Sequence, residues 1–301
     1  AKAVRTGSLN SVLFPQNVVE NAQRIISDLR SVFPPTRDQH VFGPMAKFGW
    51  GTPTMLTMEV GVVLQVPSIE IALLGAFHVD LPDEDAGLNS LNLAVFGYLD
   101  IPDKFLSVDA SLYDSRIVAW TVSGDMAMRL RWGDNAKFML SVGGFNPRYD
   151  PPKGFPELDR ITASLTPPSG QPRLEYTGYL AVTPNTFQVG AAVALRADVG
   201  PLTVDGKLAL DALFQFNPFK FIVDFLAELS VTFNGNGLSI KIDGTISGPG
   251  PFRIEGKVHV DVLMFSVTAR MDVSIGSGGE TEELPAAKVM PQLTEALGRP
   301  G

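Results

Sequence analysis

The chain has 301 residues, of which 45% are hydrophobic and 19% charged, so a packed protein is expected rather than a disordered one. Its net charge of −8 is broken by no basic block, which argues against nucleic acid as a partner. The lack of any cysteine removes disulfides, thiolate catalysis and zinc–sulfur sites from consideration.

The first predicted element is an amphipathic helix over residues 17–33. Asn17 is a suitable N-cap, and Pro34 with Pro35 ends the helix. Apolar residues recur on one helical face, namely Val18, Val19, Ala22, Ile25, Ile26, Leu29, Val32 and Phe33. We expect this helix to pack against a sheet or to plug one end of it.

From residue 51 to residue 276 the apolar period is two instead. One side of the first such segment carries Leu56, Met58, Val60, Val62, Leu64 and Val66, and the other carries Thr57, Glu59 and Gln65. Similar stripes follow over residues 69–79, 91–99, 106–112, 187–199 and 219–233. This alternation is typical of antiparallel strands with an apolar inner side and a polar outer side, and it predicts about fourteen of them.

Two segments fifty residues apart are nearly the same: GPLTVDGKLALDAL at 200–213 and GPFRIEGKVHVDVL at 250–263. We interpret both as building units of a curved sheet, each a strand entered through Gly-Pro. Gly206 and Gly256 fall on the inward side of these strands, where a larger side chain is expected to overpack the interior.

So many strands exceed what one flat sheet holds. The fold prediction is therefore a mainly β chain with one large, strongly curved antiparallel sheet, forming a closed or nearly closed barrel or groove. Residues 1–50 form the N-terminal helix and lead-in, 51–276 the β domain, and 277–301 a flexible linker with a short helical tail. The Pro- and Gly-rich stretch 143–160 is expected to be a long surface loop between two halves of the sheet. The leading helix and the acidic strand faces argue against strands that cross a membrane, although their periodicity alone is compatible with that.

Motifs that carry chemistry are scarce. The three histidines, His40, His78 and His259, lack metal-binding spacing, and no nucleophile elbow, Walker loop or dinucleotide fingerprint is present. The stretch DLPDEDAGLN at 80–89 places Asp83, Asp85 and Asn89 around a glycine, as hard-cation loops do, but it lacks the glutamate that completes an EF-hand. The ordinary interpretation is a loop between strands. We assign no catalytic, cofactor-binding or metal-binding residue.

Aromatic residues are concentrated between residues 214 and 233. The phenylalanines there are Phe214, Phe216, Phe219, Phe221, Phe225 and Phe233. Core packing is the ordinary explanation for them. The alternative is that they line a cavity too wide for side chains to fill, which would hold an apolar ligand.

Three stretches carry a family resemblance: FNPFKF, AKFGWGTPTMLTMEVGVVLQVP and GTISGPGPFRIEGKVHVDVLMFSVTARMDVSIG. Over roughly residues 40–276 the chain resembles a microbial family of domains of unknown function, the one numbered sixty-six hundred and three, found in large modular proteins. Phe252 stands where an aromatic Trp is expected in that family. The resemblance implies a β-rich module without an assigned reaction and offers no catalytic residues.

These observations favour a non-enzymatic structural or interaction module of a larger protein or assembly. Its expected partners are other protein modules or subunits of that assembly. The alternative is a carrier or conduit for lipid-like apolar ligands, bound in the concave face of the sheet.

Overall fold

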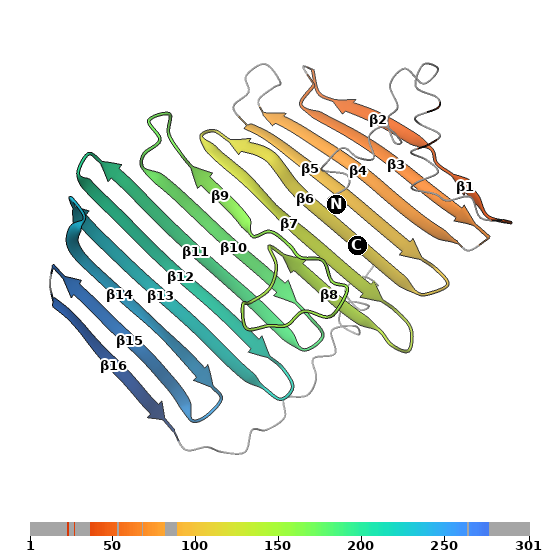
Figure 1. Cartoon of the computed structure of the whole chain (residues 1–301). Coiled ribbons are helices and arrows are strands. Elements are labelled where there is room, and N and C mark those ends of the chain that lie inside the picture. The colour runs from red at the N-terminus through yellow and green to blue at the C-terminus, as the bar shows by residue number, and fades with distance from the viewer. Residues whose placement is uncertain are drawn as a thin grey trace.

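The computed structural model describes residues 37–52, 54–67, 69–81, 89–263 and 265–276, together with Gln23 and Ser27. Within these residues the chain forms sixteen β-strands (Figure 1). The strands are β1 (His40–Phe42), β2 (Met45–Trp50), β3 (Leu56–Val66), β4 (Glu70–Leu81), β5 (Asn89–Asp100), β6 (Phe105–Ile117), β7 (Trp120–Arg131), β8 (Lys137–Val142), β9 (Ile161–Leu165), β10 (Arg173–Val182), β11 (Thr186–Val199), β12 (Leu202–Gln215), β13 (Lys220–Phe233), β14 (Asn236–Gly248), β15 (Phe252–Val262) and β16 (Phe265–Ile275).

All sixteen strands belong to one antiparallel sheet whose strands follow one another nearly in chain order (Figure 1). The path runs from β1 through β3 to β8, continues at β10 and ends at β16, while β2 pairs with β3 beside β1. Hairpin turns make most of this arrangement, because every strand except β1, β8 and the last strand, β16, pairs with the strand that the chain forms next.

One position in the sheet is shared by two strands. Both β8 and β9 lie between β7 and β10, β8 along one part of these neighbours and β9 along the other. The chain leaves the sheet after β8 and returns to it at β9. Residues 143–160 therefore form a long loop that connects two strands in the same position of the sheet. This segment lies in front of the sheet in Figure 1. The predicted long loop is therefore present, but the sheet continues past it and is not divided into halves.

The register assigns each side chain to one of two faces, because directly opposite residues of antiparallel strands share a face. We call one the apolar face; it carries the rows that contain Val60, Met128 and Leu229. The other, the mixed face, carries the rows that contain Glu59, Arg129 and Glu228. The predicted alternation therefore sorts the side chains correctly.

The most buried side chains lie mainly on the mixed face. Near the N-terminal end of the sheet, Val63, Leu74 and Ala94 form a small apolar cluster there. The largest fully buried side chains are polar: Gln188, Asn146, Ser111 and Ser141. Ser111, Ser141 and Gln188 point to the mixed face of their strands. Asn146 belongs to the 143–160 segment, which covers that face. The expectation that the apolar stripes face an enclosed core is wrong for the described residues, because no second layer lies over the apolar face there.

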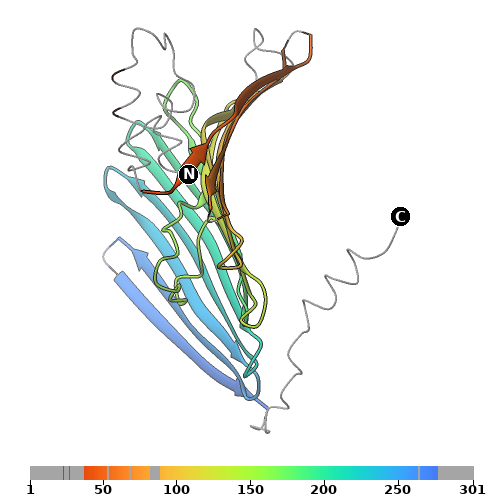
Figure 2. The same cartoon turned by 90° about the vertical axis from the view of Figure 1, so that its right-hand side faces the viewer.

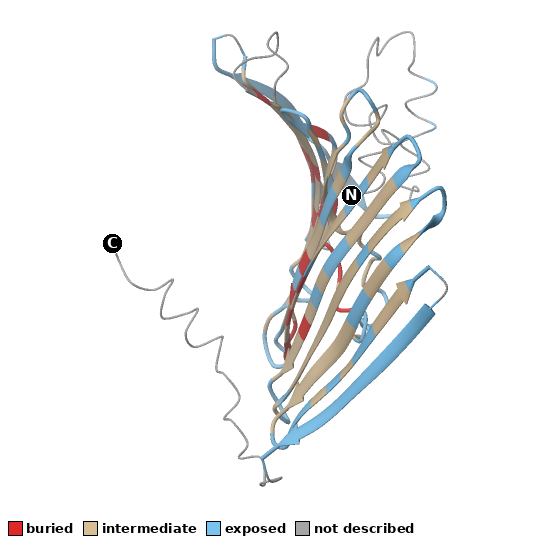
Figure 3. Ribbon diagram, turned by 90° about the vertical axis from the view of Figure 1, so that its left-hand side faces the viewer, coloured by how far each residue is buried: buried red, intermediate tan, exposed pale blue. Residues whose placement is uncertain are grey.

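The mainly β, antiparallel character is confirmed, but closure of the sheet is not found. Strands β1 and β2 lie at one end of the strand order and β16 at the other, and no pairing joins these ends in the described part of the chain. Figures 2 and 3 show a curved sheet that is open along its edges. The period of two determines which way side chains point, but it contains no information on whether the first and last strands meet. The predicted helix over 17–33 and the tail after residue 276 lie outside the described residues, Gln23 and Ser27 excepted.

Candidate functional site

The apolar face is continuous across the sheet. Paired positions on this face carry no Asp, Glu, Lys or Arg from β3 to β16. One row across the C-terminal half consists of Leu174, Leu195, Gly206, Leu229, Ile240, Val260 and Val267. Several large side chains of this face are well exposed, including Leu208 at 58% and Phe265 at 78%. Large contiguous apolar patches of this kind mark interaction surfaces in folded proteins.

A row of phenylalanines crosses one end of the apolar face. Phe187, Phe214 and Phe221 are neighbours across β11, β12 and β13, with ring centroids 6.3 Å apart at each step. Phe252 of β15 follows at 5.9 Å from Phe221. The ring of Phe221 reaches across β14 because Gly248, which lies between these two strands, has no side chain there.

The structure places four of the six phenylalanines predicted to line an apolar site on one face of the sheet, with Phe233 at the far end of β13 from Phe221. Phe214, Phe221, Phe225 and Phe233 share the apolar face, whereas the other two lie at the β12–β13 turn. Phe225 lies over Gly244 of β14, as Phe221 lies over Gly248. Aromatic rings that cover cross-strand glycines in this way help to fix strand register. The described residues place these phenylalanines on a half-exposed surface and not around an enclosed cavity.

The centre of the mixed face is covered by the 143–160 segment. Arg160 holds the segment in shape, because its guanidinium donates to the carbonyl oxygens of Gly143 and Phe145 at 2.8 and 2.7 Å. Arg148 makes a two-fold contact with Asp224 on β13, at 2.6 and 2.7 Å. The backbone N–H of Asn146 donates to the buried Gln188 side chain at 2.9 Å. The contacts of Arg148 and Asn146 join the segment to the sheet through directional hydrogen bonds, and those of Arg160 join the two ends of the segment.

Burial and charge shift the titration of the groups under this segment. Arg160 lies 3.9 Å over the ring of Tyr179, and burial lowers the pKa of Arg160. Burial also raises the pKa of Tyr179, and its hydrogen bond of 2.8 Å to Asp211 raises it further. The pKa of Asp224 is lowered, because hydrogen bonds from Arg148 and Thr245 outweigh the opposite effect of burial. The lowered pKa of Asp224 favours its carboxylate form opposite Arg148, and the raised pKa of Tyr179 favours the protonated hydroxyl that donates to Asp211.

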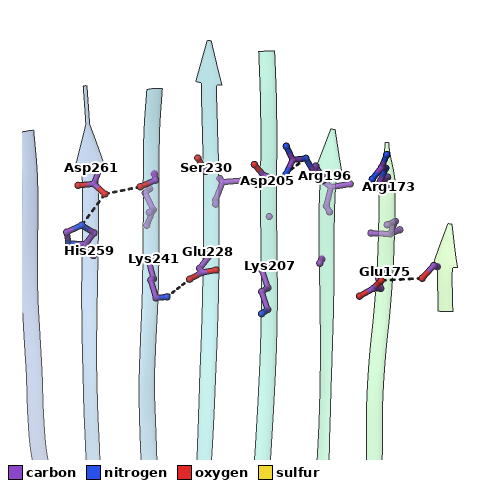
Figure 4. A pocket seen from close by; sticks show the side chains of 18 of the residues that line it. Arg173, Glu175, Arg196, Asp205, Lys207, Glu228, Ser230, Lys241, His259 and Asp261 are labelled. Atoms are coloured by element: carbon purple, nitrogen blue, oxygen red, sulfur yellow. Dashed lines mark hydrogen bonds and ion pairs between the residues drawn. The ribbon is translucent and has the colours of Figure 1, made fainter. Parts of the chain in front are cut away.

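Beside the covered centre, the mixed face has a shallow depression of about 840 Å³ (Figure 4). It extends from β9 to β15, and Figure 4 shows charged side chains from successive strands along it. Its basic side chains are Arg173, Arg196, Lys207 and Lys241, and its acidic ones are Glu175, Asp205, Glu228 and Asp261. With four basic and four acidic side chains, the depression favours neither anions nor cations.

Most charges in the depression are already paired with one another. Lys241 forms an ion pair with Glu228, which raises the pKa of Lys241. Arg196 lies 3.8 Å from Asp205, and His259 lies 3.1 Å from Asp261. Exposed pairs of this kind contribute little to stability, because solvent and salt screen them. The depression is therefore a solvated polar surface with cross-strand pairs, and the apolar face is the stronger candidate site.

The stretch at 80–89, interpreted as an ordinary loop in preference to a cation site, is not tested, because residues 82–88 lie outside the described part of the chain. Among the described residues, no group of three or more His, Asp or Glu side chains is arranged to hold a metal ion. No helix of the described residues is long and apolar enough to cross a membrane. Sequence reasoning missed the arginines that attach residues 143–160; their only signal was charge within a Pro- and Gly-rich stretch.

Comparison with known proteins gives one match. Residues 1–298 match the model of DUF6603, a family of unknown function. No curated protein matches the chain, and no solved structure matches it.

Proposed function

We propose that this chain, which belongs to the DUF6603 family of unknown function, is a non-enzymatic interaction module whose apolar face packs against another protein layer. One observation carries the proposal: the apolar face has no charged side chain at its paired positions from β3 to β16 and is half-exposed. A sheet with one apolar face needs a second layer over it, and folded domains consist of at least two such layers.

The size of the face favours a protein layer over a single small ligand. Fourteen strands lie along the sheet's main path. At ~4.8 Å between strands and ~3.3 Å per residue, a face of this width and about eleven residues deep covers roughly 2,200 Å². A standard protein interface buries about 800 Å² on each partner. The face is therefore large enough for a stable interface.

The alternative function, a carrier or conduit for lipid-like ligands, also has an observation in its favour. In Figure 2 the strands of the N-terminal half are curved, and their concave side faces away from the 143–160 segment. Because that segment lies on the mixed face, the concave side is the apolar face. A concave apolar face would suit acyl chains, and their presence can be tested directly.

The test uses the 301-residue chain purified without detergent, with Leu208→Glu as the variant and Lys207→Glu as its control. The two residues are neighbours in β12, both exposed, and point to opposite faces. If the apolar face is exposed in the isolated chain and covered only when a protein partner binds, the wild type should bind the dye ANS strongly, because this dye binds to exposed apolar surface. Leu208→Glu should lower that binding at least about twofold, since a carboxylate interrupts the apolar surface, and Lys207→Glu should not.

Native mass spectrometry of the same samples separates the two functions. Co-purified lipid on the wild type, lost in Leu208→Glu, would replace the interaction module with the carrier. A wild type that binds neither lipid nor ANS would show that the chain covers its own face, and would overturn both proposals.

A further inference from the structure

The C-terminal edge of the sheet is long and unprotected. Strand β16 has eleven residues, all exposed, and among the described strands it pairs with β15 alone. It contains no proline, and its pairing with β15 continues without a bulge from Phe265 to Ile275. Its outer N–H and C=O groups are therefore free to pair with another strand.

The opposite edge is built differently. There the outermost position is divided between β1 and β2, of three and six residues, with Gly43 and Pro44 between them. Short strands and proline are the usual means of preventing an edge from pairing with another chain. One edge of this sheet is thus interrupted, and the other is left complete.

The charges at β16 point to what the complete edge accepts. Lys257 of β15 lies directly opposite Arg270 of β16, and neither has an ion pair or a side-chain hydrogen bond among the described residues. At the next pair on this face, Glu255 lies opposite Asp272, but Arg253 bridges these two carboxylates at 2.6 and 3.1 Å. Like charges directly opposite each other are unfavourable. Lys257 has a compensating carboxylate opposite it on its other side, Asp243 of β14, whereas Arg270 lies on the last described strand and has no residue opposite it on its outer side.

We propose that two copies of this chain pair through β16, antiparallel, with Arg270 of each copy opposite Asp272 of the other. In this register Met271 lies opposite its own counterpart at the two-fold axis. Alanine and valine at 269 and 273 then face each other, as do threonine and serine at 268 and 274. A two-fold axis perpendicular to the sheet keeps both apolar faces on one side.

Neighbouring registers are less favourable. A shift by two residues in one direction places Arg270 opposite Arg270, and a shift in the other direction places Asp272 opposite Asp272. A shift by one residue sets apolar side chains against polar ones, because alternate residues point to opposite faces. The charges of β16 therefore select one self-complementary register, which places a carboxylate directly opposite Arg270.

This inference concerns the edge of the sheet and does not depend on the function proposed for the apolar face. The first test measures the mass of the full chain by light scattering across a concentration series. We expect a dimer for the wild type and dissociation that is easier by about tenfold or more for Arg270→Asp, because both cross-copy ion pairs become repulsive.

Arg270→Asp also separates an interface effect from misfolding. Within one chain the new carboxylate lies opposite Lys257, so the melting temperature of the monomer should stay equal or rise while the dimer is lost. Exchanging both residues, as Arg270→Asp with Asp272→Arg, restores opposite charges across the axis and should restore the dimer. A wild type that stays monomeric, or an exchange variant that dimerises no better than Arg270→Asp alone, would overturn the proposal.

Disulfide cross-linking tests the register itself. Because the chain has no native cysteine, any disulfide must form between the introduced thiols. Met271→Cys places two thiols opposite each other at the axis, within the Cα separation that a disulfide spans. Ala269→Cys serves as the control, because residue 269 of one copy lies opposite residue 273 of the other and the two introduced thiols are four residues apart along the strands. We expect an oxidised dimer for Met271→Cys and little for Ala269→Cys. Equal cross-linking of both variants would mean random collision and would refute the register.

Discussion

The mixed face and the apolar face share the same strands and differ in what covers them. At the centre of the mixed face, polar side chains such as Gln188 and Ser141 are fully buried beneath residues 143–160. On the apolar face, large side chains such as Leu208 and Phe233 remain more than half exposed, at 58% each. Buried polar groups need partners at fixed distances and angles, and the chain supplies them itself. An apolar surface needs only to be removed from water, which requires no fixed distances or angles. A second molecule can therefore provide the cover when it binds.

The largest effect is expected where the covering segment leaves the sheet. Gly143 has φ of 74°, and a Cβ there would clash with the carbonyl oxygen of Gly178. Gly143→Ala should lower the free energy of unfolding by about 3 kcal/mol or more, measured by chemical denaturation, since the backbone itself must shift. Gly154→Ala is the control, because its φ of 86° is equally unusual but no heavy atom lies within 4 Å of its Cβ position. That variant should lose about 1 kcal/mol. Equal losses would mean that the close approach at Gly143 contributes nothing.

A smaller effect is expected from the guanidinium that holds the segment together. Arg160→Met should cost about 2–3 kcal/mol, because two carbonyl oxygens lose a charged donor while the buried volume is kept. Hydrogen exchange of residues 145–158 should also become faster, since the segment loses the hydrogen bonds that hold its two ends together. Arg173→Met is the matched control: Arg173 is exposed and donates to a turn carbonyl at 3.2 Å. It should change stability by less than about 0.5 kcal/mol. Unchanged exchange in Arg160→Met would show that the segment is held by other contacts.

The alternation of apolar and polar residues was enough to predict the strands and their two faces. It succeeded for Leu56 to Val66 and for Phe219 to Phe233, where the pattern holds without interruption. Residues 51–276 contain fourteen strands, as predicted, and the pattern missed only β1 and β2 among the described strands, which lie in the segment taken as a lead-in to the β domain. Burial was wrongly assigned for a different reason. A stripe of apolar residues indicates that a face avoids water, but it does not say that the same chain provides the cover.

The contacts of the covered centre were beyond sequence reasoning for a related reason. Arg148 and Asp224 are 76 residues apart, and only the full register of the sheet brings them together. The phenylalanines were found because they recur at a spacing of two within one strand. The edge charges at Lys257 and Arg270 depend on the pairing of β15 with β16, which the sequence pattern alone does not specify.

The apolar face itself can be probed at Phe221, which is half-buried and contacts the rings of Phe214 and Phe252. In a packed core a Phe→Ala change costs about 3–5 kcal/mol, so on this open face we expect about 1–2 kcal/mol. Phe233→Ala, at an exposed strand end, should cost less than about 1 kcal/mol. Unfolding should be measured at two protein concentrations. A loss near the packed-core value that grows with concentration would show that the apolar face is covered in solution by another copy.

The smallest effect is expected at the repeated glycines, and it distinguishes the two faces most directly. Gly206 lies on the apolar face, where an added Cβ would be 3.9 Å from the Cβ of Leu195, an ordinary contact. The interior there is not crowded, contrary to the expectation from the repeat. Gly206→Ala should therefore change stability by less than about 0.5 kcal/mol, or raise it slightly, because alanine is less flexible than glycine in the unfolded chain.

Gly190 lies on the mixed face of the neighbouring strand, under the ring of Tyr179, which an added Cβ would displace from Asp211. Gly190→Ala should cost about 1–3 kcal/mol in the same denaturation experiment. Comparable losses at both positions would show that the apolar face is as tightly packed as the mixed one, and the distinction between the two faces would fail.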